Sequence, residues 1–337
     1  MTASKPRVLR LGQVAFAHQR WAELSKVAEI VECTSSLRAE FIEDLQSKYR
    51  DVVGITRTFH SISQTGRFDS ELVSYLPPSV KAVCHCGAGY DQIDVEPLNA
   101  RGIQLSNVTV PVEAPTADTA IYLVLTALRN FQIGHDFLAA GKWGVDKGPQ
   151  APLGRDPEGK VVGILGMGGI GRAIRDRLQP FGFGKITYHN RTRLSPELEK
   201  DSKYVGYDDL IANSDVIFIS VPLNAHTRHS VNKELFAKMK TGVVIVNTAR
   251  GAVIKELDLI ESLKEGKIGS FASDVFEHEP SVPKELYSLP NVVSLPHMGT
   301  FTREAVQHLE EWVVDNIEAF ITEGKVKTIV PEQYNLF

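Results

Sequence analysis

Several features that mark particular classes of protein are scarce or missing in this chain of 337 residues. It has three cysteines, an odd number and too few for a disulfide framework. No apolar run approaches the length of a membrane span, and the N-terminus lacks the apolar core of a signal peptide. A net charge of -4 gives no electrostatic reason to expect binding to nucleic acid or to an anionic membrane. We therefore expect a cytoplasmic protein without either kind of partner.

A metal site is not expected either. The run Cys84-His85-Cys86 brings two thiols and an imidazole together, but groups this close in sequence need distant ligands to complete a tetrahedral shell. Because unpaired cysteine is among the most often buried residues, we interpret these cysteines as small apolar side chains on a buried strand.

Short apolar segments alternate with polar helical segments along the chain, which indicates an α/β fold. Continuous apolar runs such as Val216-Ile217-Phe218-Ile219 are typical of parallel strands covered on both faces. We therefore predict two doubly wound parallel-sheet domains, Rossmann-like or flavodoxin-like. The predicted strands form two series, at residues 8–11, 52–55, 82–86 and 104–107, and then at residues 161–165, 186–189, 216–221, 243–247, 268–272 and 292–295.

Two helical segments indicate how these domains are connected. Residues 302–323 form one long amphipathic helix after the last strand, too little for a domain, so we expect it to return to the N-terminal sheet. The helix at residues 113–130 is apolar around most of its circumference and should be buried between domains or against a second subunit. A discontinuous substrate domain, residues 1–110 plus 299–337, is thus predicted to contain an inserted dinucleotide-binding domain, residues 111–298.

The most informative motif is a glycine fingerprint that follows the first strand of the second series. Gly166, Gly168 and Gly171 have the G-x-G-x-x-G spacing, which allows a tight turn, close approach of a pyrophosphate and close packing of the following helix, predicted at residues 172–181. The phosphates would bind at the N-terminus of that helix, where free NH groups and the helix dipole favour anions. Residues 142–160, before this strand, are expected to form an irregular surface loop.

The end of the next strand indicates which dinucleotide is bound. NAD sites usually place Asp or Glu there, where it binds the ribose 2′-hydroxyl. This chain has Asn190-Arg191-Thr192-Arg193 instead. Two guanidinium groups and a hydroxyl suit a 2′-phosphate, because a phosphate is charged and accepts parallel hydrogen bonds. A solvated basic turn is the alternative, but the missing acid and the added arginines both favour NADPH/NADP+ over NADH.

Three polar residues follow later strands, at the edge where open α/β sheets bind ligands. Arg250 can bind a carboxylate through two parallel hydrogen bonds, and His297 carries the side chain best suited to exchange a proton near neutral pH. Glu279 lies in the loop between them, where a hydrogen bond to His297 would favour the imidazolium form. Each residue alone is more often an ordinary loop residue, but their shared placement beside one nucleotide site favours catalysis.

The chain resembles the D-2-hydroxy-acid dehydrogenase family almost from end to end. Segments 115–118 and 128–131 are more similar to its fungal glyoxylate-reductase-like members. The resemblance rests on Gly87-Ala88-Gly89-Tyr90-Asp91-Gln92-Ile93-Asp94, Ala117-Asp118, the glycine fingerprint, Asn247-Thr248-Ala249-Arg250-Gly251, Asp274-Val275, Glu279-Pro280 and Pro296-His297-Met298-Gly299.

This resemblance implies a homodimer of two-domain subunits, which we expect to associate through the region of residues 113–130. It implies hydride transfer to a 2-keto acid, with Arg250, Glu279 and His297 as the catalytic residues. The backbone NH groups of Ala88 and Gly89 would bind the substrate carboxylate together with Arg250. Predicted cofactor contacts, besides the fingerprint glycines and the four residues from Asn190 to Arg193, are Thr116, Gly169, Ile170, Val221, Pro222, Thr227, Thr248, Ala249, Arg250, Asp274, His297 and Gly299.

We therefore predict reduction of a small 2-keto acid, such as glyoxylate or hydroxypyruvate, to the D-2-hydroxy acid with NADPH. Closure of the two domains is expected to align hydride donor and acceptor. Two alternatives remain open. One is a nucleotide-sensing interaction protein resembling the C-terminal-binding corepressors, which could retain the same three polar residues. The other is a dehydrogenase for larger 2-keto acids, resembling mandelate dehydrogenase-like members.

Overall fold

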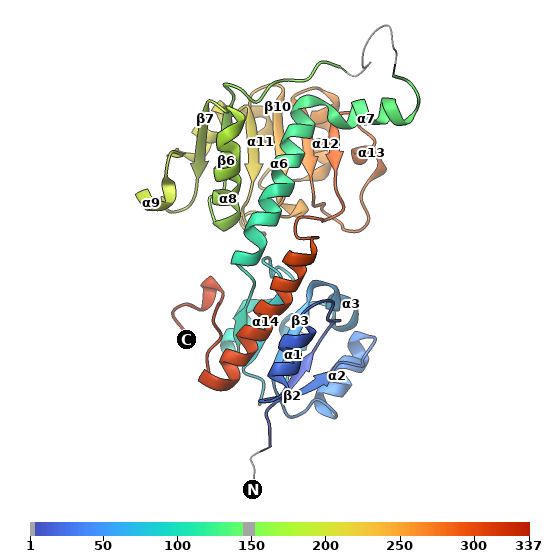
Figure 1. Cartoon of the computed structure of the whole chain (residues 1–337), viewed down its shortest axis with the longest axis vertical. Helices are drawn as coiled ribbons and strands as arrows, with labels where there is room; N and C mark the ends of the chain where they lie inside the picture. The colour runs from blue at the N-terminus through green and yellow to red at the C-terminus, as the bar shows by residue number, and fades with distance from the viewer. Residues whose placement is uncertain (1–3, 144–151) are drawn as a thin grey trace. The chain divides into compact units, whose positions relative to one another are not determined.

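The computed structural model describes residues 4–143 and 152–337, which form two compact units (Figure 1). Of the described residues, the first unit comprises 4–112 and 302–337, and the second comprises 113–143 and 152–301. The domain boundaries expected from the sequence lie a few residues from these divisions. Part of the loop expected at residues 142–160 lies outside the described residues, namely residues 144–151.

The first unit is built on a five-stranded parallel sheet with the order β2-β1-β3-β4-β5. This is the flavodoxin-like order. The strand β2 was not predicted, because its two central apolar residues lie between glutamates at the edge of the sheet and remain partly exposed. The strands are β1 (Arg7–Arg10), β2 (Glu29–Glu32), β3 (Val52–Thr58), β4 (Ala82–Cys86) and β5 (Gln104–Ser106).

Helix α14 (Arg303–Glu323) returns to this sheet and packs on β3 and β4, as expected from the sequence, and it lies beside α1 (Figure 1). Gly54 in β3 allows the close approach, because a Cβ atom at this position would lie 2.5 Å from Cδ1 of Ile317. The other helices of this unit are α1 (His18–Leu24), α2 (Arg38–Gln46), α3 (Ile62–Thr65), α4 (Ser70–Tyr75) and α5 (Val95–Ala100), with short 3-10 turns η1 (Phe59–Ser61), η2 (Val110–Val112) and η5 (Pro331–Gln333).

The second unit contains a seven-stranded parallel sheet with the order β12-β11-β10-β9-β6-β7-β8. Strands β6 to β8 are added toward one side of the sheet and β9 to β12 toward the other, so the strand order reverses between β6 and β9, as in dinucleotide-binding folds. Only the two-residue edge strand β8 had no counterpart in the predicted series. The strands are β6 (Val161–Leu165), β7 (Lys185–His189), β8 (Lys203–Tyr204), β9 (Val216–Ile219), β10 (Val243–Asn247), β11 (Ile268–Ser273) and β12 (Val292–Ser294).

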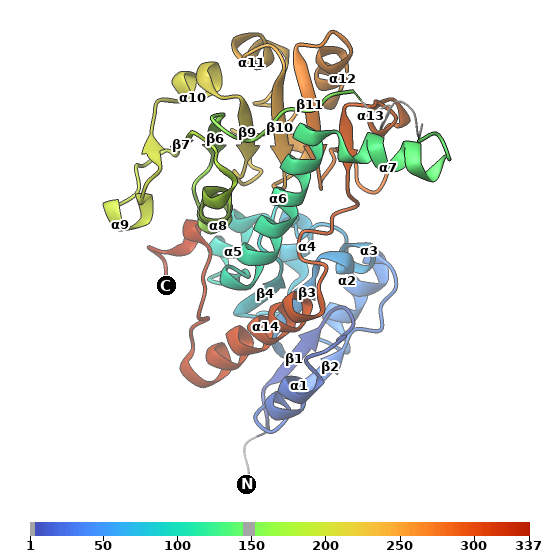
Figure 2. The same ribbon diagram turned by 45° about the horizontal axis from the view of Figure 1, so that its top comes forward.

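Helices cover both faces of this sheet. Helices α6 and α8 share one hydrophobic cluster with the strands, and α10 to α12 share a second cluster on the other face (Figure 2). The apolar helix predicted at residues 113–130 is α6, and much of its apolar surface is buried against its own unit. The helices are α6 (Glu113–Arg129), α7 (Phe131–Ala139), α8 (Gly169–Leu178), α9 (Pro196–Glu199), α10 (Tyr207–Asn213), α11 (Lys233–Lys238), α12 (Glu256–Lys264) and α13 (Lys284–Tyr287), with 3-10 turns η3 (Gln179–Phe181) and η4 (Gly251–Val253).

The glycine fingerprint forms the turn between β6 and α8. Gly166 has φ of 97°, and a Cβ atom there would collide with the backbone carbonyl of Ser220. A Cβ atom on Gly171 would collide with the carbonyl oxygen of Gly166, so the helix could not pack this closely on the turn. The prediction of a helix over residues 172–181 was wrong at both ends. The helix begins at Gly169 inside the fingerprint and ends at Leu178, because Pro180 favours the 3-10 turn that follows.

Cys84 and Cys86 lie on β4, as expected from the sequence, but Cys33 follows β2 outside any strand, and Cys33 and Cys86 are only partly buried. Cys84 is buried in β4, and burial raises the pKa of the Cys84 and Cys86 thiols to about 12, so both stay protonated and poorly nucleophilic at neutral pH. Among the described residues, no helix is both long and apolar enough to cross a membrane.

Candidate active site

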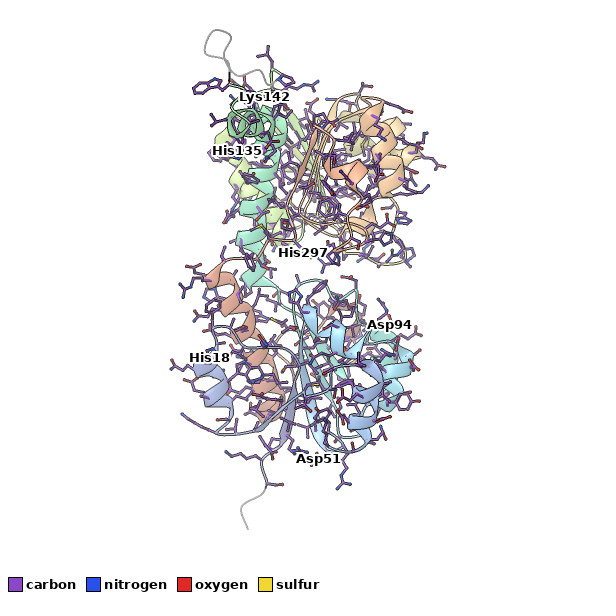
Figure 3. All side chains as sticks on the ribbon, turned by 90° about the vertical axis from the view of Figure 1, so that its right-hand side faces the viewer. His18, Asp51, Asp94, His135, Lys142 and His297 are labelled. Carbon is purple, nitrogen blue, oxygen red and sulfur yellow. The ribbon has the colours of Figure 1, made fainter. Side chains whose placement is uncertain are left out.

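The three predicted catalytic residues follow three neighbouring strands of the second unit. Arg250 comes after β10, Glu279 after β11 and His297 after β12. Because parallel strands end at the same edge of the sheet, the three loops meet there. Figure 3 shows His297 at the end of this unit that lies opposite His135 of α7.

His297 and Glu279 form a direct pair. Nδ1 of His297 lies 2.7 Å from Oε2 of Glu279, whose other oxygen accepts a hydrogen bond from the backbone N–H of Phe276 at 2.9 Å. His297 has φ of 55°, an uncommon conformation for a residue with a side chain, and its backbone N–H donates to the carbonyl oxygen of Asp274 at 2.9 Å. The surrounding structure therefore imposes the position of the imidazole.

Asp274 fixes the turn that carries His297. Its two carboxylate oxygens accept the backbone N–H groups of Met298 at 2.6 Å and Gly299 at 2.7 Å. Burial raises the pKa of Asp274, while these two hydrogen bonds act in the opposite direction. Its predicted contact with the nicotinamide stays a prediction, but its role in holding the turn is visible in these bonds.

Arg250 is positioned by a residue to which the sequence assigned no role. The fully buried side chain of Asn247 accepts a hydrogen bond from the N–H of Ala249 and donates one to the carbonyl oxygen of Arg250, both at 3.0 Å. The Arg250 side chain itself donates to the carbonyl of Ala249 at 2.8 Å. The sequence feature that could have indicated this positioning role is the polar Asn247 directly after the apolar run Val243-Val244-Ile245-Val246.

The electrostatics of the pair suit proton transfer. Burial alone would raise the pKa of Glu279, but the hydrogen bond and the positive charge of His297, together with Arg250, outweigh burial and hold this pKa below its ordinary value. Glu279 is therefore ionised at neutral pH and orients the ring through Nδ1. An imidazole oriented in this way is suited to exchange a proton through its second ring nitrogen, Nε2.

The residues predicted to bind the nucleotide fit such a group. A Cβ atom at Gly168 would meet open space, so the backbone is accessible where a pyrophosphate would approach the N-terminus of α8. Asn190 lies beside this turn, since its Oδ1 accepts the N–H of Met167 at 2.7 Å. The end of β7 and the fingerprint are therefore tied together.

The two predicted arginines differ in their surroundings. Arg193 donates to the buried Glu199, at 2.7 Å from Nη2, and these bonds lower the pKa of Glu199, which also accepts the hydroxyl of Tyr188 at 3.0 Å. Arg191 and Thr192 are exposed. This anchoring of Arg193 could not be predicted from the sequence, because the pairing depends on how the chain turns between residues 193 and 199.

The remaining predicted residues lie in loops at the same edge, in helices α6 and α8, or in the first unit. Thr116 and Asp274 both lie beside Gly299, and the hydroxyl of Thr227 donates to the carbonyl of Pro222 at 2.7 Å in the loop that also holds Val221. Thr248 and Ala249 belong to the loop fixed by Asn247, and Gly169 and Ile170 open α8. In the first unit, Asn107 and His85 contact the carbonyl oxygens of Ala88 at 2.8 Å and Gly89 at 3.0 Å, which holds that loop in place.

Residues 121–299 match the family described as D-isomer specific 2-hydroxyacid dehydrogenase, NAD binding domain. The chain is 51% identical to glyoxylate reductase 1 of Saccharomyces cerevisiae, covering 99% of this chain and 97% of that protein. It is 47% identical to 4-methyl-2-oxopentanoate reductase A of Aspergillus oryzae, covering 98% of this chain and all of that protein (100%).

Solved structures of similar proteins share the fold over nearly the whole chain. A glyoxylate reductase from Paecilomyes thermophila has a TM-score of 0.94 at 44% identity, covering 98% of this chain and 99% of the other. D-mandelate dehydrogenase of Rhodotorula graminis has a TM-score of 0.89 at 30% identity, covering 97% and 98%. An NADPH-dependent glyoxylate/hydroxypyruvate reductase of Sinorhizobium meliloti, in complex with NADP and malonate, has a TM-score of 0.84 at 32% identity, covering 98% of both chains.

The pKa of Glu279 provides a test of the pair, because burial and His297 act on it in opposite directions. Replacing His297 with Phe removes the hydrogen bond and the positive charge, so burial is less opposed and the pKa of Glu279 should rise. Carboxyl-carbon NMR across a pH series measures this, with Lys284→Ala, in a nearby helix, as the control variant.

The same linkage has a consequence for stability. Since the pKa of Glu279 is lowered on folding, its ionised form stabilises the wild-type protein at neutral pH, and this contribution is lost as the pH falls below about 4. A Glu279 pKa that stays unchanged in the His297→Phe variant would contradict the importance of the pair.

Proposed function

The chain belongs to the D-isomer specific 2-hydroxyacid dehydrogenase family, and on that basis we propose that it reduces glyoxylate, hydroxypyruvate or a related 2-keto acid with a preference for NADPH. The observation that carries this proposal is the His297–Glu279 pair at 2.7 Å on the loops next to Arg250. The relatives described above are reductases or dehydrogenases, which favours an enzyme over the interaction protein considered as an alternative.

The proposed reaction assigns one task to each side chain. Arg250 binds the substrate carboxylate and polarises the keto oxygen, and the backbone NH groups of Ala88 and Gly89 are proposed as further donors to the carboxylate. A bound nicotinamide supplies a hydride to the carbonyl carbon. Nε2 of His297 donates a proton to the carbonyl oxygen, so the product is a 2-hydroxy acid. Glu279 keeps the imidazole oriented through Nδ1.

Replacing His297 with Ala tests the acid directly. Loss of a positioned general acid typically costs about 10²- to 10⁴-fold in turnover, and we expect a loss of this size in kcat, with nucleotide binding retained. Steady-state kinetics and nucleotide titration by fluorescence measure the two quantities. His308→Ala is the matched control, because this exposed histidine lies on α14 of the first unit. Turnover at the wild-type rate in the His297→Ala variant would rule out the assignment.

The preference for NADPH is supported by the orientation of Asn190. The N–H of Met167 is a donor, so the carboxamide must turn its oxygen toward that group. The NH₂ end of Asn190 is then directed elsewhere, and it can donate to a phosphate where an aspartate would repel one. The exposed Arg191 and Thr192 are further proposed donors, and the anchored Arg193 adds positive charge to the same turn.

Asn190→Asp should therefore change the cofactor preference with little change in structure. One carboxylate oxygen can keep the hydrogen bond from Met167, while the other repels a 2′-phosphate and can accept from a ribose hydroxyl. We expect the ratio of dissociation constants for 2′,5′-ADP and ADP to shift by about tenfold or more toward ADP. Isothermal titration measures this without turnover, and Asn213→Asp on α10 is the control. An unchanged ratio would argue against a role of Asn190 in cofactor choice.

A second copy of the chain is the proposed partner of α7. This helix has no buried residue among those described, and Phe131 is 51% and Leu138 is 57% exposed. Tyr122 on the adjoining α6 is 48% exposed. Apolar side chains exposed together are typical of an interface, so we place the contact at α7 and the outer side of α6, not along α6 as a whole.

Leu138→Glu should place a charge in this interface and shift the protein from dimer to monomer. Sedimentation equilibrium measures the change. Leu257→Glu, at a 71% exposed position of α12, should leave the dimer intact. If both variants and the wild type have the same mass in solution, α7 is not the contact.

Larger 2-keto acids remain a second candidate class of substrate. Met298 is 40% exposed and Phe301 is 75% exposed, both within four residues of His297. Exposed apolar side chains beside a reactive group can contact an apolar substrate side chain. The similarity to 4-methyl-2-oxopentanoate reductase A and to D-mandelate dehydrogenase supports testing such acids.

A further inference from the structure

A second histidine–glutamate pair lies close to the proposed catalytic pair. Nε2 of His229 is 2.5 Å from Oε1 of Glu277, which precedes Glu279 by two residues. The Glu277 side chain is only 13% exposed, and that of His229 is 37% exposed. Neither residue has a role in the proposed reaction.

Glu277 also connects its loop to the start of α12. Its backbone N–H donates to Oε1 of Glu256 at 2.7 Å, and its Oε2 accepts the N–H of Glu256 at 3.4 Å. Burial raises the pKa of Glu256, and the negative charge of Glu277 acts in the same direction. The carboxyl groups of Glu256 and Glu277 lie close together, so each needs a positive partner or a hydrogen-bond donor. The imidazole of His229 is such a partner for Glu277.

The backbone of His229 contacts the loop that carries Arg250. Its N–H donates to the carbonyl oxygen of Ala252 in η4 at 2.9 Å, and its φ of 52° is an uncommon conformation for histidine. The Arg250 loop also touches the loop that carries Glu277 and Glu279, because a Cβ atom on Gly251 would collide with the backbone of Phe276. Movement of one loop is therefore transmitted to the other.

We propose that His229 is a positioning residue for the reduction, acting through Glu277 on the loop that holds Glu279 and through Ala252 on the loop that holds Arg250. The inference rests on the proposed function, because it assigns His229 to the same catalytic groups. His229 contacts both loops from a third, the loop containing Thr227. A displacement of about 1 Å in a catalytic group can cost 10²-fold in rate, so a residue that fixes two such loops affects turnover without touching the substrate.

The test compares His229→Leu with His229→Gln. Leucine cannot donate to Glu277, whereas the glutamine side chain retains a donor NH₂ group. We expect kcat to fall by about 10- to 100-fold in His229→Leu, with the dissociation constant for NADPH changed less than about twofold, and to recover most of the way in His229→Gln. Lys233→Ala is the matched control, because it breaks the exposed Lys233–Glu261 pair, at 2.9 Å, on the helix that follows.

Hydrogen exchange gives a readout that does not depend on turnover. The N–H of Phe276 donates to Glu279, so its protection should fall in His229→Leu and stay at the wild-type level in Lys233→Ala. Equal kcat and equal protection in His229→Leu and the wild type would overturn the inference, even if the variant melts at a lower temperature. Failure of the proposed function is a different outcome, namely a wild-type protein that reduces no 2-keto acid.

Discussion

The hydrogen bond between His297 and Glu279 is the interaction on which the proposed chemistry depends. The bond needs β11 and β12 to be neighbours and to end at the same edge of the sheet. It also needs the turn at residues 297–299 to keep its shape. Asp274 holds this turn, because its carboxylate accepts the backbone N–H groups of Met298 and Gly299. The parallel sheet thus brings the loops of the proposed proton donor and of the proposed anion-binding arginine to one edge, although the two residues are separated by nearly fifty residues of sequence.

Buried or partly buried acids hold the loops of this unit in place. Asp274 fixes the turn of His297, Glu199 anchors Arg193 and the end of β7, and Glu277 joins α12 to the loop of Glu279. In each case the carboxylate binds backbone N–H groups or a cationic side chain, which offsets the cost of burial. The sheet therefore carries loops whose shapes are set by charge-assisted hydrogen bonds, and Arg193, Asp274 and His297 lie in such loops.

Much of the fold could be predicted from the sequence, because parallel strands and glycine turns leave local patterns. The apolar runs located most strands, and the fingerprint located the β6–α8 turn. The weakly apolar edge strand β2 and the exact start of α8 left no such pattern. Arg250, Glu279 and His297 could be proposed as catalytic residues from their positions after strands. The partners Glu199, Glu277 and His229 were not, because their roles arise from contacts between segments that are distant in the chain or joined by irregular turns.

Initial rates with a panel of 2-keto acids test the central claim most directly. Glyoxylate, hydroxypyruvate and 4-methyl-2-oxopentanoate would each be assayed with NADPH and with NADH under the same conditions, and kcat/KM determined for every combination. We expect keto-acid-dependent oxidation of NADPH, with kcat/KM several-fold higher than with NADH for every acid that is reduced. Equal or faster rates with NADH would contradict the cofactor assignment, and no turnover with any of the acids would contradict the proposed reaction itself.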